Sequence, residues 1–132
     1  MEYAGNQEIV RHQEMCETLL HRAEFLDPKD QALLKQSLER GANATEIAKL
    51  MGVPPRQIQR KLKRLMTHLI DPRVVQILRH HREWDKRTRG VALSYFVRGW
   101  TLREVADRLK MTLHEVRKRK IEIQAILDAT LK

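Results

Sequence analysis

The chain has 132 residues, of which 33% are charged and only 5% are aromatic. It carries 26 Lys and Arg residues against 17 Asp and Glu residues, so its formal net charge is +9 at pH 7. These values predict one helical domain or two very small ones. A basic balance of this size favours an anionic partner, with nucleic acid as the first candidate. The alternative is a basic surface that serves only solubility.

The composition also limits the cellular compartments in which the protein is expected. No apolar run approaches the roughly 20 residues of a membrane span, and residues 1–8 lack a secretory signal pattern. Cys16 is the single cysteine, so an intrachain disulfide is excluded and a reducing interior is expected. We therefore expect no membrane partner and a cytoplasmic, nucleoid-associated location. The charge is uneven, because residues 1–30 hold seven acids and three bases whereas residues 31–132 hold ten acids and 23 bases.

The first 26 residues predict an acidic amphipathic helix. Apolar residues recur at helical spacing from Ile9 to Leu26. Asp27 and Pro28 then end this helix and begin the next one. We expect the first helix to cover the apolar face of the segment that follows it. Two alternatives are pairing with a second chain, which would give a homodimer, and docking on RNA polymerase.

One segment of the chain occurs twice, at a constant offset of 58 residues and without a gap. The two copies, residues 41–53 and 99–111, read GANATEIAKLMGV and GWTLREVADRLKM. Each has a helix-capping residue, Asn43 or Thr101, three positions before a glutamate. Self-similarity of this kind outranks a single motif as evidence for a fold. We predict that a helix begins after the capping residue in each copy.

A second helix is expected after each copy, and in the second copy Thr112 and Glu115 form another capping pair at its start. Gly52 suits the left-handed residue of a tight turn, whereas Lys110 at the equivalent position should cost up to about 1 kcal/mol. The helix after the first copy carries an apolar stripe of Ile58, Leu62, Leu65 and Leu69, which requires a helix that runs to about Ile70. The helix after the second copy keeps most of this stripe but has Lys120 in place of one leucine. We expect Ile121 and Ile126 to displace the second stripe slightly.

These patterns predict an all-α fold, because no segment shows the two-residue alternation of a strand. We expect two tandem helix-turn-helix units with an additional N-terminal amphipathic helix. The expected boundaries are 1–26 for that helix, 27–71 for the first unit and 72–132 for the second unit with its connecting helix. Several aromatic side chains are expected to lie in the core, namely Phe25, Trp84, Tyr95, Phe96 and Trp100.

Residues 41–69 resemble region four of bacterial sigma factors and the related LuxR-type DNA-binding domain. The resemblance rests on the glycine, the capping residue, Glu46-Ile47-Ala48, Met51-Gly52-Val53, Pro55-Arg56, Ile58, Leu62 and Leu65. Residues 99–127 match less well. The resemblance implies a bacterial or phage protein whose second helix enters the DNA major groove, and region four also contacts RNA polymerase. The chain lacks the aromatic-rich region that melts promoter DNA in complete sigma factors.

The candidate DNA-binding residues follow from this placement. The first turns of such a helix approach base edges, where Arg pairs with guanine and Gln with adenine. In the first copy the outward residues are Arg56, Gln57, Gln59, Arg60 and Lys63, while Lys61 and Arg64 point elsewhere and are expected to meet phosphate. In the second copy the candidates are Arg103, His114, Arg117, Lys118, Arg119 and Lys120. The alternative for the second copy is a structural or protein-binding repeat. The basic residues within 79–89 would follow a phosphate backbone or form a solvated face.

No pattern in the chain indicates an enzyme, a cofactor or a metal site. His12 and Cys16 can share a helix face, but two ligands do not make a structural zinc site. The sequence therefore predicts a sequence-specific double-stranded DNA-binding protein that regulates transcription. One alternative is a sigma-like adaptor that binds RNA polymerase or another transcription protein without reading DNA. An RNA binder is a further alternative, although no RNA-module signature is present.

Overall fold

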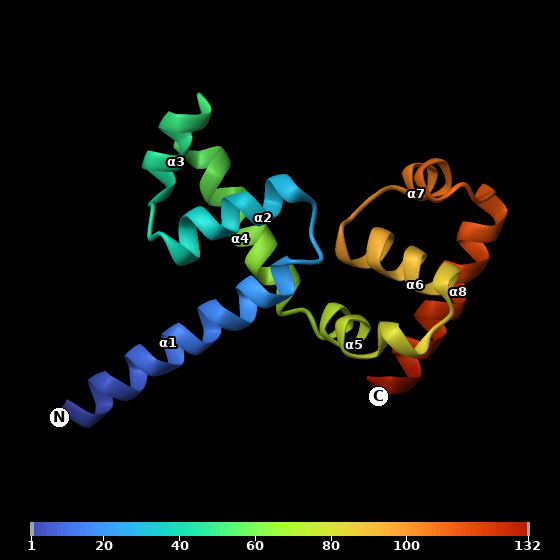
Figure 1. Cartoon of the computed structure of the whole chain (residues 1–132), viewed down its shortest axis with the longest axis horizontal. Coiled ribbons are helices and arrows are strands. Elements are labelled where there is room, and N and C mark those ends of the chain that lie inside the picture. Colours follow the sequence, from blue (N-terminus) through green and yellow to red (C-terminus); the bar gives the residue numbers. More distant parts are fainter. Residues whose placement is uncertain (1, 132) are drawn as a thin grey trace. The chain divides into compact units, whose positions relative to one another are not determined.

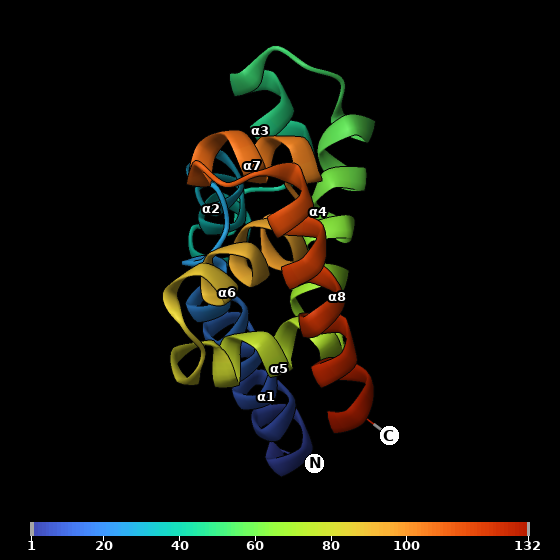
Figure 2. The ribbon, with the colours of Figure 1, turned by 90° about the vertical axis from the view of Figure 1, so that its right-hand side faces the viewer.

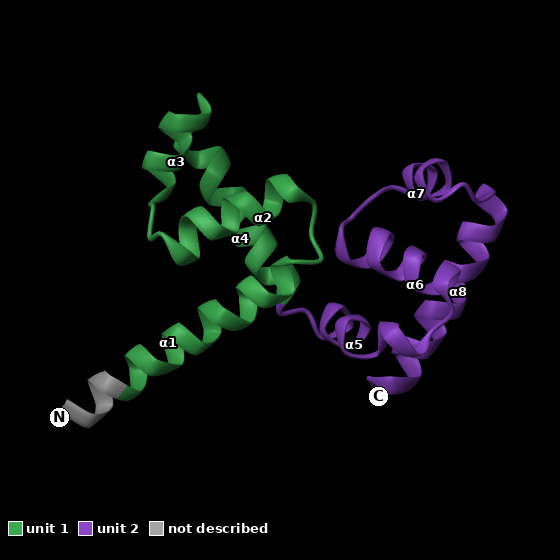
Figure 3. Cartoon of the chain, in the orientation of Figure 1, with its two compact units in different colours: residues 1–69 green, residues 70–132 purple. Residues whose placement is uncertain are grey.

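A computed structural model describes residues 2–131 of the chain, with side chains described over residues 7–131. The described residues form helices and connecting turns without any strand, which confirms the all-α prediction. The chain divides into two compact units, residues 1–69 and 70–132 (Figure 3). Within the described residues, no helix combines the length and the apolar character needed to cross a membrane.

The first unit contains four α-helices and one π-helical segment (Figure 1). In chain order these are α1 (Glu2–Ala23), α2 (Pro28–Leu34), η1 (Lys35–Glu39), α3 (Ala44–Met51) and α4 (Pro55–Leu69). Their apolar faces meet in a core that consists of Leu19, Ala23, Leu26, Leu33, Leu34, Ile47, Ala48, Ile58, Leu62, Leu65 and Leu69. All four residues of the predicted stripe on α4 are buried, so this face of the helix packs into the core of the unit.

Helix α1 belongs to the first unit, but only its C-terminal part packs there. Leu19 and Ala23 are buried, and the Arg22 guanidinium donates to the Leu69 carbonyl over 2.9 Å, which ties α1 to the end of α4. Between residues 7 and 18 every side chain is exposed except that of Cys16. Figure 1 shows this part of α1 extending away from the other helices of its unit.

The second unit has the same succession of elements with one addition, a 3₁₀ turn after its first helix. They are α5 (Pro72–His80), a short 3₁₀ turn η2 (His81–Glu83), α6 (Lys86–Val91), the π-helical η3 (Ala92–Val97), α7 (Leu102–Leu109) and α8 (Leu113–Thr130). The buried apolar residues of this unit are Val74, Ile77, Val91, Ala92, Val97, Val105, Ala106, Val116, Ile123 and Leu127. Figure 2 shows α7 at the N-terminal end of α8, the same relation that α3 has to α4.

The 58-residue offset extends through the backbone geometry of both units. Helices α2 and α6 begin 58 residues apart, and so do α4 and α8. Both π-helical segments end with one wide turn, in which Arg40 N–H donates to the Lys35 carbonyl at 3.1 Å and Arg98 N–H donates to the Leu93 carbonyl at 2.9 Å. The sequence repeat therefore corresponds to a repeat of the backbone hydrogen-bonding pattern. This structural repeat begins at α2 and α6, before Gly41 and Gly99, at which the similarity in sequence begins.

The two units differ along the buried stripe of their last helix. Lys120 is half-buried where the first unit has the buried Leu62. Ile121 and Ile126 are 68% and 41% exposed, so the expectation that they displace the stripe is wrong. They lie on the outer side of α8 because Val116, Ile123 and Leu127 already fill the side that faces the core.

Candidate nucleic-acid interface

The start of α3 is fixed by the predicted capping residue. The Glu46 N–H donates to Asn43 Oδ1 at 2.8 Å, and the Asn43 amide donates to Glu46 Oε1 at 2.9 Å. These bonds satisfy backbone and side-chain groups that a helix start leaves open. Ile47 and Ala48 are buried at 3% and 1% exposure, so α3 packs closely on the rest of the unit.

A tight left-handed turn joins α3 to α4. Gly52 has φ 70° and ψ 30°, a conformation that glycine adopts without a steric penalty. The Val53 N–H donates to the Ala48 carbonyl at 3.1 Å and closes the turn. Helix α4 then begins at Pro55, whose fixed φ is already helical. The turn therefore sets the position of the first residues of α4 relative to α3.

All but one of the contact residues predicted for the first unit gather on the outer face of α4. Six side chains are exposed and make no ion pair within residues 7–131, namely Arg56, Gln57, Gln59, Arg60, Lys63 and Arg64. Several of them line an open hollow of about 500 Å³. The exception is Lys61, whose ammonium lies 3.1 Å from a carboxylate oxygen of Asp30. Lys61 thus stabilises the unit itself.

The electrostatics of this face favour an anion. No acidic residue occurs from residue 52 to residue 70. The N–H groups at the start of α4 add the partial positive charge of a helix N-terminus. Unpaired cations beside a helix start attract phosphate groups. The Asp30 carboxylate, which lies on α2, is paired with Lys61 of α4.

The second unit positions α7 and α8 in the same way. Thr101 Oγ1 accepts the Glu104 N–H at 3.1 Å, and Thr112 Oγ1 accepts the Glu115 N–H at 3.1 Å. Both predicted capping pairs are thus present. Four of the predicted residues are exposed on these helices and make no ion pair among the described residues, namely Arg103, His114, Arg117 and Lys118.

Two further predicted residues of α8 are engaged within the second unit. The Arg119 guanidinium lies 3.2 Å from Asp85 Oδ2 and donates to Thr88 Oγ1 at 2.7 Å. The Lys120 ammonium lies 4.9 Å from the centre of the Tyr95 ring. The sequence did not indicate these partners, because Arg119 is 34 residues from Asp85 and 31 from Thr88. Two of the four consecutive cations on α8 therefore contact their own unit.

The Asp85 carboxylate organises the start of α6. It accepts the Thr88 N–H at 2.8 Å as the helix cap. That backbone bond, together with the Thr88 hydroxyl and the Arg119 guanidinium, holds the pKa of Asp85 below its usual value. Asp27, the equivalent residue of the first unit, makes no capping bond with its side chain. Glu115 on α8 pairs in turn with Arg87 of α6, which reduces the free positive charge on α6.

The aromatic residues lie less deeply than expected. Phe25, Trp84, Tyr95, Phe96 and Trp100 are each half-buried, so the prediction that they form the core is wrong. Trp100 lies beneath two cations, with the Arg108 guanidinium 4.2 Å and the Arg98 guanidinium 5.5 Å from its ring centre. The space inside the unit is filled by small aliphatic residues instead, with Ala92 and Val97 at 0% and 1% exposure.

The histidines give no evidence of a metal centre. Cys16 Sγ lies 3.7 Å from His12 Nε2, so these two residues do share a face of α1. Across the part of the chain that the structure describes, no three His, Cys, Asp or Glu residues form a group able to hold a metal ion. His81 is buried, and burial together with the charges of Arg82 and Arg89 lowers the pKa of its imidazole.

The first unit also presents an apolar surface that the sequence did not single out. Leu50 and Met51 at the end of α3 are 81% and 59% exposed. With Leu33 and Val53 they line a hollow of about 490 Å³. Exposed large aliphatic residues that adjoin a hollow often mark a surface for another protein. Helical spacing alone could not show that these two residues face outward.

Comparisons with protein-family models, with curated proteins and with solved structures find no match to this chain.

Proposed function

We propose that the protein binds double-stranded DNA sequence-specifically and regulates transcription. In this proposal each unit is a helix-turn-helix, and α4 enters the major groove with α3 across the backbone. Arg56, Gln59 and Arg60 read base edges, whereas Arg64 and neighbouring cations neutralise phosphates. Helix α8 adds a second contact through Arg117 and Lys118. Arg119 and Lys120, which contact their own unit, are left out of this surface.

One observation carries the proposal. The outer face of α4 consists of exposed Arg, Lys and Gln side chains without an ion pair among the described residues, and its inner face is the buried stripe. A surface helix with only a structural role usually mixes charges of both signs. A helix of this kind fits the major groove, which admits a single α-helix.

The decisive experiment is selection of bound sequences from a random duplex pool with the full chain. We expect an enriched motif, and a motif of two half-sites if both units read DNA. If six to eight phosphates are neutralised, log affinity should fall with log salt at a slope of roughly −5 to −7. An unenriched pool together with a flat salt response would contradict the proposal.

The apolar hollow beside Leu50 and Met51 favours a second candidate function. In this alternative the protein is an adaptor that binds RNA polymerase or another transcription protein through the first unit. A pull-down after nuclease treatment separates the two functions. The adaptor predicts that Leu50→Lys releases polymerase subunits while Arg60→Ala retains them, and that the free protein has no affinity for duplex DNA.

The exposed part of α1 supports an arrangement in which two chains act together. Ile9, Val10 and Met15 are 57%, 49% and 52% exposed on a stretch that makes no packing contribution to its unit's core. A helical stretch as short as residues 7–18 is marginal in water when nothing packs against it. Ile9 and Val10 lie about 100° apart around the helix, so pairing of α1 with the same helix of a second copy would cover both of them. A dimer would also place two copies of α4 on repeated half-sites.

A further inference from the structure

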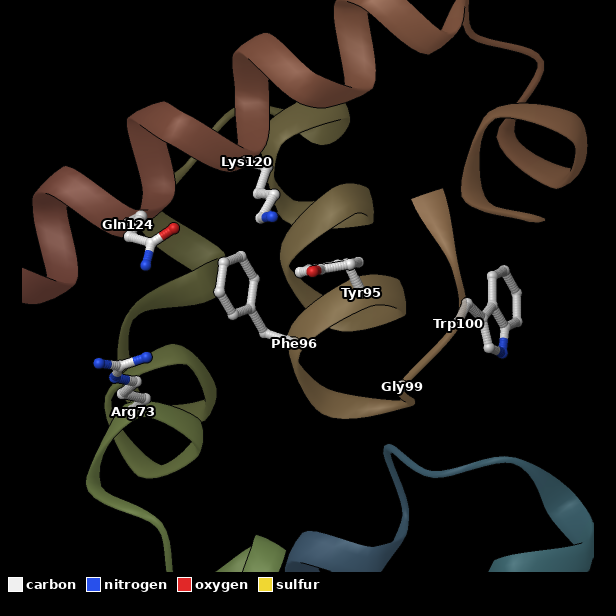
Figure 4. Close-up of a pocket in the computed structure, with 7 residues that line it drawn as sticks. All are labelled: Arg73, Tyr95, Phe96, Gly99, Trp100, Lys120 and Gln124. Carbon is white, nitrogen blue, oxygen red and sulfur yellow. The ribbon is translucent and has the colours of Figure 1, made fainter. Parts of the chain in front are cut away.

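The second unit contains a pocket of about 420 Å³ that the DNA-binding proposal does not use. Its lining combines aromatic rings with two cations and an amide, namely Tyr95, Phe96, Trp100, Arg73, Lys120 and Gln124. Figure 4 shows Lys120 and Gln124 reaching from α8 toward the two rings of η3, with Phe96 between Gln124 and Arg73 in this view. None of the lining residues is acidic.

The cations in this pocket are available to a ligand. Among residues 7–131, neither Arg73 nor Lys120 forms an ion pair with a carboxylate. Lys120 is half-buried, and its ammonium rests 4.9 Å from the centre of the Tyr95 ring. Arg73 is exposed at the mouth of the pocket. A half-buried cation such as Lys120, without a carboxylate partner, favours binding of an anion.

The first unit provides an internal comparison, because its equivalent positions lie 58 residues earlier. Lys120 corresponds to Leu62, Arg73 to Met15, Gln124 to Met66 and Phe96 to Leu38. All four positions are aliphatic or thioether in the first unit, where Leu62 belongs to the core. The fold therefore does not require polar residues at these positions. At these four positions the second unit carries two cations, an amide and an aromatic ring where the first unit carries apolar side chains.

We propose that this pocket binds a nucleotide. Phe96 and Tyr95 meet edge to face, with ring centres 5.0 Å apart and planes at 87°. Such a pair leaves at least one face of Phe96 uncovered by Tyr95, and a base can stack there. The Gln124 amide offers a donor and an acceptor to the base edge. Lys120 and Arg73 bind the phosphate.

The volume of the pocket favours a nucleotide over a smaller anion such as inorganic phosphate. Small-molecule sites commonly measure about 300 to 1,000 Å³, and the pocket falls in that range. Inorganic phosphate would make no use of the Phe96 ring face, and a nucleoside would bring no anion to Arg73 and Lys120. The nucleotide is either a free mononucleotide or an unpaired nucleotide of a nucleic-acid strand, since both present a base and a phosphate.

Calorimetric titration of the full chain with AMP, GMP, CMP and TMP tests the free form. We expect saturable binding of at least one of them, and binding at least about tenfold weaker for the corresponding nucleoside and for Lys120→Leu. Phe96→Leu should weaken binding without a change of charge. Both variants insert the residue of the first unit, and thermal unfolding verifies their folding. Lys86→Met removes an exposed charge that does not line the pocket, and should leave affinity unchanged.

A second arm tests the strand form with two hairpins of DNA, one fully paired and one carrying a single unpaired nucleotide. If the strand is the source, the wild-type chain prefers the second hairpin, and Lys120→Leu loses this preference but keeps its affinity for the paired hairpin. If neither mononucleotides nor the unpaired nucleotide bind in a manner that depends on Lys120 and Phe96, the proposal is wrong. Arg60→Ala separates this result from the proposed function, because it should weaken duplex binding and preserve nucleotide binding.

Discussion

Lys110 holds in the second unit the left-handed backbone position that Gly52 holds in the first. The two residues are 58 positions apart, and their φ and ψ angles are 56° and 50° for Lys110 and 70° and 30° for Gly52. Lys110 is the single non-glycine residue with positive φ among the described residues. The turn geometry is therefore maintained in the second unit without the residue that adopts it most readily.

Exchanging the residues at the two turn positions should have opposite effects on the free energy of unfolding. Lys110→Gly should raise the free energy of unfolding by up to about 1 kcal/mol, because a side chain in the left-handed region is strained. Gly52→Lys should lower it by a similar amount, since nothing lies within 4 Å of a Cβ added at Gly52 and only the backbone strain remains. Urea unfolding of both variants measures this. Destabilisation by Lys110→Gly would show that the lysine side chain contributes more than the strain removes.

On α4, Arg60 and Arg64 should affect DNA binding differently. Arg60→Ala should reduce affinity for the selected site by about 1 to 3 kcal/mol and leave random DNA less affected, because it removes a base contact. Arg64→Ala should weaken both duplexes alike and reduce the salt slope by about 1, because it removes a phosphate contact. Titrations on both duplexes at several salt concentrations give these values. Equal losses of affinity on both duplexes for Arg60→Ala would show that the protein binds DNA without sequence specificity.

On α8, Arg119 and Arg117 form a matched pair. Arg119→Ala should lower stability by about 1 kcal/mol, because the side chain bonds to Thr88 and Asp85 in a partly buried site. It should leave DNA affinity unchanged once the protein is folded. Arg117→Ala should leave stability unchanged and weaken DNA binding. Thermal unfolding and duplex titration of both variants test the assignment, which fails if Arg119→Ala weakens DNA binding more than Arg117→Ala.

The exposed apolar residues of α1 predict self-association. Sedimentation of the wild-type chain should show a dimer, and Ile9→Glu should shift it to a monomer, because a charge cannot be buried without a partner. Thr18→Glu introduces the same charge half a turn around the helix from Ile9, at another exposed position of α1, and should retain the dimer. A wild-type chain that sediments as a monomer at all concentrations would exclude the arrangement.

Buried His81 predicts a loss of stability at mildly acidic pH. Its pKa is lowered in the folded chain, chiefly by burial and also by Arg82 and Arg89. The unfolded chain, with a histidine pKa of about 6.5, therefore binds the proton first as pH falls. Stability should decline from about pH 7.5 downward through the region of pH 6.5, until the folded chain is protonated as well. His81→Gln should show a flatter decline in urea unfolding at each pH, and an unchanged decline would contradict this origin.

Local patterns in the sequence predicted the elements well. The caps at Asn43, Thr101 and Thr112 and the stripe on α4 are present because each depends on residues three or four positions apart. The placement of Arg119 and Lys120 was not predictable in this way. Their partners lie on α6 and η3, and no local spacing indicates which side of α8 those elements cover.

The helical class, the repeat and the basic character of α4 follow from the sequence, because periodicity, capping and net charge are properties of neighbouring residues. Which of the cations are free depends on how the helices pack. Arg60 faces outward, whereas Lys61 is paired with Asp30 and Arg119 with Asp85. An ion pair forms where the packing of helices brings together residues that are distant in the chain, and packing depends on the shape of the whole core.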